Sequence, residues 1–423
     1  MCERDRRMTE EKRRQLQEAI QQQIIHQTGQ SELYSDEEMM EEIERCVLNM
    51  GQTEYLSIHE KMAISHDIFN AIRRLDVLQD LLDDPEVTEI MINGSEHIFV
   101  EKNGRIRDSG KRFQSRQKLE QVIQQIVSKM NRVVNESTPI VDVRLENGSR
   151  VNVVLPPIAI DGPAVTIRRF PDQPMDMDQL LQIGSLNQEA ADFLQMVVRA
   201  RYNIFISGGT GSGKTTFLNA LSDFIPGDER IITIEDSAEL QIRNIPNLVR
   251  MEARNANVEG KNAVSIRDLV RSALRQRPDR IIIGEIRDAA VIELLSAMNT
   301  GHDGSISTGH ANSPADMLRR METLVLTGMD IPLPAVRSQI ASAIEIIIQL
   351  GRLRDKTRKV LEIDEVVGIE QGEICLQPLY CFRETTDSSL QKVCGSLEAV
   401  EKLRHTRKLE QSGVLLEQAG QAV

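Results

Sequence analysis

The pattern of apolar and polar positions divides the 423-residue chain into stretches of different periodicity. Residues 1–75 show helical spacing with many charges, and residues 76–170 show short β-rich runs separated by tight-turn dipeptides. From residue 186, apolar strands alternate with helical stretches, which is typical of a parallel sheet in an α/β domain. The pattern therefore predicts an α/β protein with a smaller α+β domain and a helical N-terminal extension.

The helical extension carries two helix-start signals. Ser35-x-x-Glu38 and Ser57-x-x-Glu60 have the capping-box pattern, in which the serine and glutamate oxygens each accept a free backbone N–H. Gly51 marks the expected end of the first helix. One packing face is expected on the second helix, formed by Ile58, Met62, Ser65, Phe69 and Ile72. These features favour a packing or adaptor bundle without chemistry.

The expected strands of the α/β domain are residues 202–207, 230–235 and 280–284. A helix is expected over 117–130 in the smaller domain. Two prolines, Pro171 and Pro174, and the acidic residues after them predict a linker. The expected divisions are a helical region over 1–75, an α+β domain over 76–170, a linker over 171–185, the α/β domain over 186–383 and a tail over 384–423.

Composition narrows the function classes. Acids outnumber bases 64 to 51, and only 3% of residues are aromatic, with no Trp. A basic nucleic-acid surface or a channel that stacks bases is therefore disfavoured. The five cysteines lack CxxC spacing, which argues against a disulfide framework or a four-cysteine zinc site. The charged N-terminus and the lack of a long apolar run predict a cytoplasmic protein with at most peripheral membrane contact.

The sequence GGTGSGKT, which begins at Gly208, fits the phosphate-binding pattern G-x-x-x-x-G-K-[ST]. It follows an apolar strand and precedes an expected helix, and this context disfavours an ordinary glycine-rich turn. In such loops the backbone N–H groups point at phosphates, the lysine reaches the β and γ phosphates, and the hydroxyl ligates Mg²⁺. ATP and Mg²⁺ are therefore the expected cofactors. The predicted nucleotide ligands are Gly208, Gly209, Thr210, Gly211, Ser212, Gly213, Lys214, Thr215 and Thr216.

A loop of this kind needs carboxylates beside the metal and the attacking water. The strand that ends at Gly284-Glu285 supplies a candidate general base, and the alternative is a glutamate that caps a helix or pairs with Arg287. A second acidic cluster closes the strand over 230–235 and could hold Mg²⁺, partly through water, or position the nucleophile. Its residues are Glu235, Asp236 and Glu239. The alternative for this cluster is a solvated turn.

Two histidines, His302 and His310, lie in TGHDGSISTGHANSP and have no recognised zinc spacing. The pattern favours a loop that senses the γ-phosphate. The alternative is neutral packed or surface histidines.

Four segments in this order resemble the Walker A, Asp box, Walker B and His box of type II/IV secretion system ATPases. They are GGTGSGKTTFLNAL, IITIEDSAELQI, RPDRIIIGEIRD and TGHDGSISTGHANSP. Upstream, DPEVTEIMINGSEHIFVEKNGRI and GSRVNVVLPPIAIDGPAVTIRRF resemble the N-terminal domain of the tight-adherence (Flp) pilus assembly ATPases, the CpaF-like (TadA) group. The resemblance covers residues 35–370. The lack of CxxC pairs disfavours the type II secretion branch.

The resemblance implies a homohexameric ring of RecA-like P-loop motor domains, docked on an inner-membrane platform protein. ATP hydrolysis would then drive pilin extraction, pilus assembly or secretion. The resemblance implies that Lys214 binds phosphate, that Thr215 and the Asp box bind Mg²⁺, and that Glu285 is the catalytic glutamate. The implied catalytic set is Glu285, Lys214, Arg150, Arg168, Glu239 and His310.

Arg150 and Arg168 match arginines that reach the γ-phosphate from the N-terminal domain of related ATPases. Such arginines neutralise charge on the transferring phosphoryl oxygens. Ordinary strand salt bridges are the alternative role for Arg150 and Arg168, and Arg169 is an equally plausible neighbour of Arg168. Two other function classes stay open. One is a RecA-like nucleic-acid motor of conjugation or competence, and the other is a nucleotide-dependent adaptor whose ATP site mainly holds a ring together.

Overall fold

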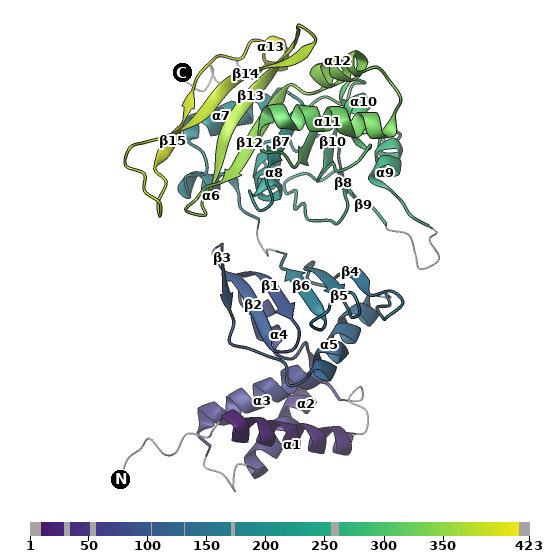
Figure 1. Ribbon diagram of the computed structural model, residues 1–423, viewed down its shortest axis with the longest axis vertical. Helices are drawn as coiled ribbons and strands as arrows, with labels where there is room; N and C mark the ends of the chain where they lie inside the picture. The colour runs from purple at the N-terminus through teal and green to yellow at the C-terminus, as the bar shows by residue number, and fades with distance from the viewer. Residues whose placement is uncertain are drawn as a thin grey trace. The chain divides into compact units, whose positions relative to one another are not determined.

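The computed structural model describes residues 10–28, 34–50, 56–102, 104–130, 132–170, 174–254 and 262–413. The expected helix end at Gly51, residues 171–173 of the predicted linker and residues 414–423 of the predicted tail lie outside these ranges. The chain forms two compact units, Met1–Asp172 and Gln173–Val423 (Figure 1). Among the described residues, no helix combines the length and the apolar character that crossing a membrane requires.

The first unit begins with three helices, α1 (Glu10–Thr28), α2 (Asp36–Met50) and α3 (Ile58–Arg73). Both predicted capping boxes are confirmed, because in each the serine oxygen and the glutamate three residues later accept the expected backbone N–H groups. The helices share one apolar core. It includes Ile20, Ile24, Met39, Ile43, Ile64, Ile68 and Phe69.

The predicted packing face of α3 is partly wrong. Ile58 and Met62 are exposed, at 79% and 66%, whereas Ile64 and Ile68 are buried. The buried stripe is therefore rotated away from the first turn of the helix, because α1 and α2 cover the side of α3 that carries Ile64 and Ile68. Helical spacing alone does not say which of two adjacent apolar stripes has a neighbour.

The rest of the first unit is an antiparallel sheet in the order β3-β2-β1-β6-β5-β4. Helix α5 (Arg116–Lys129) packs on it through Leu119, Val122, Ile123, Ile126 and Val127. The remaining elements are α4 (Leu78–Asp83), β1 (Val87–Asn93), β2 (His97–Lys102), β3 (Arg105–Asp108), β4 (Ile140–Arg144), β5 (Arg150–Val154) and β6 (Ala164–Arg168).

The second unit is built on a larger sheet in the order β15-β14-β13-β12-β7-β11-β10-β8-β9. The strands from β12 to β9 in this order are parallel, and the other three are antiparallel. The strands are β7 (Ile204–Gly208), β8 (Ile231–Glu235), β9 (Leu248–Glu252), β10 (Arg280–Ile283), β11 (Ile306–Gly309), β12 (Ile346–Arg352), β13 (Arg358–Glu370), β14 (Glu373–Glu384) and β15 (Gly395–Ala399). The three predicted strands are confirmed as β7, β8 and β10, and every residue in them is buried, as expected for a sheet covered on both faces.

Helices cover both faces of this sheet (Figure 1). Helices α6, α7 and α8 supply one core, and α9, α10, α11 and α12 supply the other. Their bounds are α6 (Met177–Gln182), α7 (Gln188–Arg199), α8 (Lys214–Ser222), α9 (Ile266–Ala273), α10 (Val291–Met298), α11 (Pro314–Gly328) and α12 (Leu333–Ala343), and α13 (Arg407–Ser412) follows β15.

Two segments expected to lack regular structure belong to this core. Helix α6 lies within the predicted linker, and its Met177 and Leu180 are buried. Strand β15 and helix α13 lie within the predicted tail, and they bury Leu397 and Leu409. Each element is short and carries few apolar residues, so its sequence signal is weak until the neighbouring elements supply a surface to pack on.

Candidate active site

The order of the parallel strands brings the four sequence motifs to one edge of the sheet. The neighbouring strands β7, β11, β10 and β8 end at the phosphate-binding loop, His310, Glu285 and Glu235, respectively. Parallel strands share a carboxyl edge, and open α/β sheets bind their ligands at that edge. A cleft of about 480 Å³ opens there. Its lining residues are Gly209, Thr210, Glu285, Arg287, His310, Ala311, Asn312 and Arg320.

Glycine is required at several points of the phosphate-binding loop. Gly211 and Gly213 have φ of +72° and +93°, in the left-handed region. A Cβ on Gly208 would lie 2.7 Å from the Leu350 carbonyl oxygen, so the loop presses directly on β12. Gly213 is the N-cap of α8, which places the positive end of that helix beneath the loop.

Lys214 connects the loop to the next strand. Its buried ammonium donates to the carbonyl oxygens of Gly208 and Gly209 at 3.0 Å each, and its Nζ lies 3.2 Å from His310 Nδ1. Because an ammonium only donates, Nδ1 accepts, and a neutral His310 carries its proton on Nε2. Burial, and then the charge of Lys214, lower the pKa of His310, which favours this neutral form.

His310 in turn faces Glu285. Its Nε2 lies 3.0 Å from Glu285 Oε1, in an orientation outside hydrogen-bond geometry, and Arg287 donates to Glu285 Oε2 at 2.8 Å. Burial alone would raise the pKa of Glu285, but the Arg287 hydrogen bond and the nearby positive charges outweigh it, so the pKa lies below its ordinary value. Glu285 is therefore ionised at neutral pH and able to accept a hydrogen bond from water.

The structure separates two of the predicted metal residues by role. The buried carboxylate of Glu235 accepts the backbone N–H groups of Glu239 and Leu240 at 2.7 and 2.8 Å, so it braces the loop after β8. Glu239 instead reaches Thr215, whose hydroxyl lies 3.5 Å from Glu239 Oε2. Both of these N–H groups bind Oε2, and the prediction that Glu235 ligates Mg²⁺ stays a prediction.

The residues present fit Mg²⁺ through Thr215 and Glu239. A hydroxyl and a carboxylate are hard oxygen donors, and Mg²⁺ in nucleotide sites takes one or two such ligands, keeps several waters and uses substrate phosphates for the rest. Asp236 is exposed on the same loop and is a candidate to act through water. When bound, the ion would neutralise phosphate charge.

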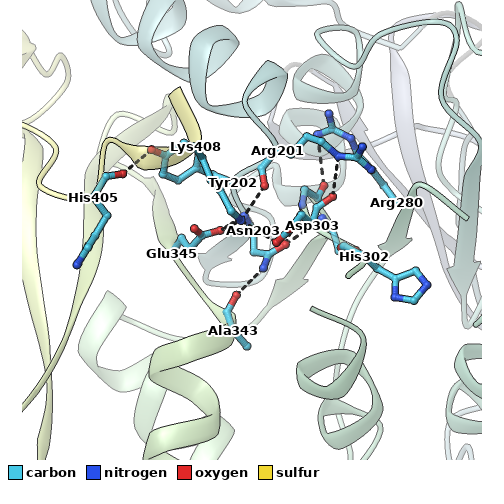
Figure 2. Close-up of polar contacts among 12 residues, drawn as sticks. Arg201, Tyr202, Asn203, Arg280, His302, Asp303, Ala343, Glu345, His405 and Lys408 are labelled. Atoms are coloured by element: carbon cyan, nitrogen blue, oxygen red, sulfur yellow. Dashed lines mark hydrogen bonds and ion pairs between the residues drawn. The ribbon is translucent and has the colours of Figure 1, made fainter. Parts of the chain in front are cut away.

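The structure also separates the two histidines that the sequence placed in one motif. His302 precedes β11 and His310 follows it, so at least about 13 Å of strand lies between them at ~3.3 Å per residue. Figure 2 shows His302 beside a polar network at the amino edge of the sheet, where Lys408 contacts Asp303 and Glu345 at 2.8 and 2.6 Å. His302 is thus removed from the candidate site.

Sequence reasoning did not single out Thr308 or Arg320, which contribute to the site in different ways. Thr308 donates to the Gly284 carbonyl at 2.6 Å and so fixes the backbone beside Glu285. Arg320 of α11 lines the cleft. The pairing of Glu285 with Arg287, which the sequence offered as an alternative role for Glu285, is present in the structure. Arg320 offered no sequence signal, because its approach depends on how α11 packs.

Comparison with known proteins adds an independent finding. The family model described as type II/IV secretion system protein matches residues 73–413. That match spans most of the chain. The chain belongs to this family. A putative conjugal transfer protein of Mycobacterium tuberculosis is 37% identical over 68% of this chain and 83% of its own length. The type IV secretion system protein VirB11 of Bartonella quintana is 30% identical, over 69% and 92%.

One solved structure is similar in fold to this secretion-family chain. The crystal structure of the pilus retraction motor PilT with bound ADP has a TM-score of 0.50 to it at 21% identity, over 81% of this chain and 89% of that chain. At this identity the likeness concerns the fold, which is the RecA-like α/β fold expected from the sequence.

The first unit of this secretion-family protein holds the two predicted arginines side by side. Arg150 on β5 lies directly opposite Arg168 on β6, so their side chains project from the same face of the smaller sheet. Arg169 instead donates to the carbonyl oxygens of Asp84 and Val87, the former through a very short contact. Arg169 is thus held by its own unit, and Arg150 and Arg168 stay the predicted pair.

Proposed function

We propose that this protein is an ATPase that couples ATP hydrolysis to the assembly or secretion work of a type II/IV system. One observation supports the proposal most strongly. Lys214 of the phosphate-binding loop lies 3.2 Å from His310, and His310 lies 3.0 Å from Glu285, so the loop is next to an ionised carboxylate in the cleft. Lys214 would bind the β and γ phosphates, and Glu285 would orient the attacking water. The lowered pKa of Glu285 makes its carboxylate a weak base, so Glu285 would mainly orient the attacking water and would contribute less by taking its proton.

More finely, we propose assembly of a Flp-type pilus by a homohexameric ring that acts at an inner-membrane platform protein from the cytoplasmic side. The support is the resemblance of residues 84–106 and 148–170 to the N-terminal domain of the tight-adherence group. The first unit would contribute Arg150 and Arg168 to hydrolysis. Membrane contact would then be peripheral and would run through partners.

A second candidate is a motor of conjugal transfer. The names of two relatives favour it, the Mycobacterium tuberculosis protein and the conjugal transfer protein TrbB of Rhizobium radiobacter, which is 34% identical over 69% of this chain. Direct DNA binding is a separate question, and the formal charge of −13 argues against it. Salt-sensitive DNA retention by the pure protein would favour the nucleic-acid motor.

The test is ATP turnover by the full chain and by Glu285→Gln, with the molar mass followed by light scattering. Glu370→Gln, an exposed carboxylate at the end of β13, is the matched control. We expect Mg²⁺-dependent turnover in a species of about six subunits, retained in the control and reduced about 10²-fold in Glu285→Gln, the scale for losing the positioning of a reactant. Unchanged turnover in Glu285→Gln would refute the assigned role. Tight binding of ATP without turnover in any of the proteins would favour the ring-adaptor alternative.

A further inference from the structure

The hairpin between β12 and β13 stands beside the phosphate-binding loop. Strand β12 is parallel to β7, and Leu350 lies opposite Gly208, where the loop begins. The chain then turns and returns as β13, so that Arg352 and Arg358 face each other across the two strands. Both side chains are exposed. The hairpin therefore carries two guanidinium groups at the same edge of the sheet as the nucleotide motifs.

Arg358 is attached to the middle of the loop. Its Nε donates to the Gly211 carbonyl oxygen at 2.8 Å, and its Cδ lies 3.4 Å from where a Cβ on Gly213 would be. Its own carbonyl accepts the Ser185 hydroxyl at 3.0 Å, so backbone and side chain are both held. Arg352 approaches the same point, with Nη1 3.8 Å from where a Cβ on Gly211 would be.

The strand order indicates which end of a bound nucleotide would lie next to this hairpin. Strands β11 and β10, which carry His310 and Glu285, lie on one side of β7, whereas β12 and β13 lie on the other. Lys214, which reaches the β and γ phosphates in such loops, points toward His310. The reacting end of the nucleotide therefore belongs to the β10–β11 side, and its nucleoside end belongs to the side of the two arginines.

We propose that Arg352 and Arg358 form the nucleoside subsite of this ATPase, stacking a guanidinium plane on the base and donating N–H groups to ribose oxygens. The inference rests on the proposed function, because it assumes that the loop binds a nucleoside triphosphate. Guanidinium planes stack on bases as aromatic rings do, and this chain has few aromatic residues and no Trp. The subsite serves affinity rather than chemistry, since it lies across β7 from Glu285.

The experiment compares two ligands by titration calorimetry on the full chain with Mg²⁺. ADP carries the nucleoside, and inorganic tripolyphosphate fills the loop without it. Arg352→Ala, Arg358→Ala and Arg358→Lys are compared with Lys356→Gln, an exposed cation at the tip of the same hairpin. We expect each Arg→Ala variant to weaken ADP binding about tenfold, the loss of one stacked or charge-assisted contact, while tripolyphosphate binding stays within about twofold. Arg358→Lys should not restore ADP binding, because an ammonium has no plane to stack.

Two outcomes for the variants would overturn the inference. Equal weakening of ADP and tripolyphosphate would mean that the arginines only brace the loop, and wild-type ADP affinity in both Arg→Ala variants would mean that they do not touch the nucleotide. A wild-type protein that binds ADP and tripolyphosphate but hydrolyses nothing would contradict the proposed function while leaving the subsite standing. Failure of the wild type to bind ADP would refute both.

Discussion

Glu235 offers a direct test of whether the loop after β8 is braced by a buried, protonatable carboxyl. The residue is 3% exposed, and its Oε1 is buried with no hydrogen-bond partner among the described residues. Burial raises its pKa to about 7, although the N–H groups of Glu239 and Leu240 and the charge of Arg250 act in the opposite direction. The substitution Glu235→Gln keeps an oxygen that can accept both N–H groups and removes the ionisation.

The magnitude follows from linkage between protonation and folding. The ordinary value for this group is 4.5, so the shift to about 7 is about 2.5 pH units, and at 1.36 kcal/mol per unit it corresponds to about 3 kcal/mol. Because the folded state holds the proton more tightly, this contribution is fully present below pH 4.5 and is lost as the pH rises through about 7. Glu235→Gln has no such loss. Its stability relative to the wild type should rise by up to about 3 kcal/mol between about pH 5 and pH 8.

The assay is urea unfolding at both pH values, with hydrogen exchange at the Leu240 amide to report on the braced loop itself. The exposed-site variant Glu370→Gln serves as the control for a Glu→Gln change. A Glu235→Gln minus wild-type difference that is independent of pH, or that falls as the pH rises, would refute the reasoning. Turnover provides a second comparison. Glu239→Gln should lower Mg²⁺-dependent turnover more than Glu235→Gln does, because Glu239 is the carboxylate beside Thr215.

Three further predictions concern other parts of the molecule. Arg150→Ala combined with Arg168→Ala should leave nucleotide affinity intact and slow hydrolysis, since an arginine on the transferring phosphate is worth ~10³–10⁵-fold; unchanged single-turnover rates would count against it. Arg280→Met should destabilise the second unit by about 3–5 kcal/mol, because it leaves the Glu229 carboxylate buried without its two-point partner. Thermal unfolding would measure this loss, and adding Glu229→Gln should recover part of it. His310, whose pKa lies below the ordinary 6.5, should give an acid limb of the turnover profile only below that pH, so a limb above it that disappears in His310→Asn would contradict the neutral assignment.

Several residues of the candidate site could be predicted from the sequence because their roles depend on neighbouring residues of the chain. The loop from Gly208 to Thr215 needs left-handed glycines, a lysine and a hydroxyl in fixed order. The sequence pattern therefore indicates directly that the loop binds phosphate. Glu285 was readable because a fully apolar strand that ends in a carboxylate marks the carboxyl edge of a parallel sheet. The smaller elements α6, β15 and α13 were not readable, because their few apolar residues gain a partner only in the assembled core.

The sequence by itself determined the class of fold, the phosphate-binding loop and the candidate carboxylates, because these depend on spacing along one or two neighbouring elements. Only the tertiary structure decided which of the acidic and histidine candidates meet the loop. In the folded protein, the Glu235 carboxylate accepts the backbone N–H groups of Glu239 and Leu240, and the Glu239 carboxylate lies beside the Thr215 hydroxyl. His302 and His310 lie at opposite ends of β11. These outcomes depend on strand order and side-chain direction, which bring distant segments together and which no local pattern encodes.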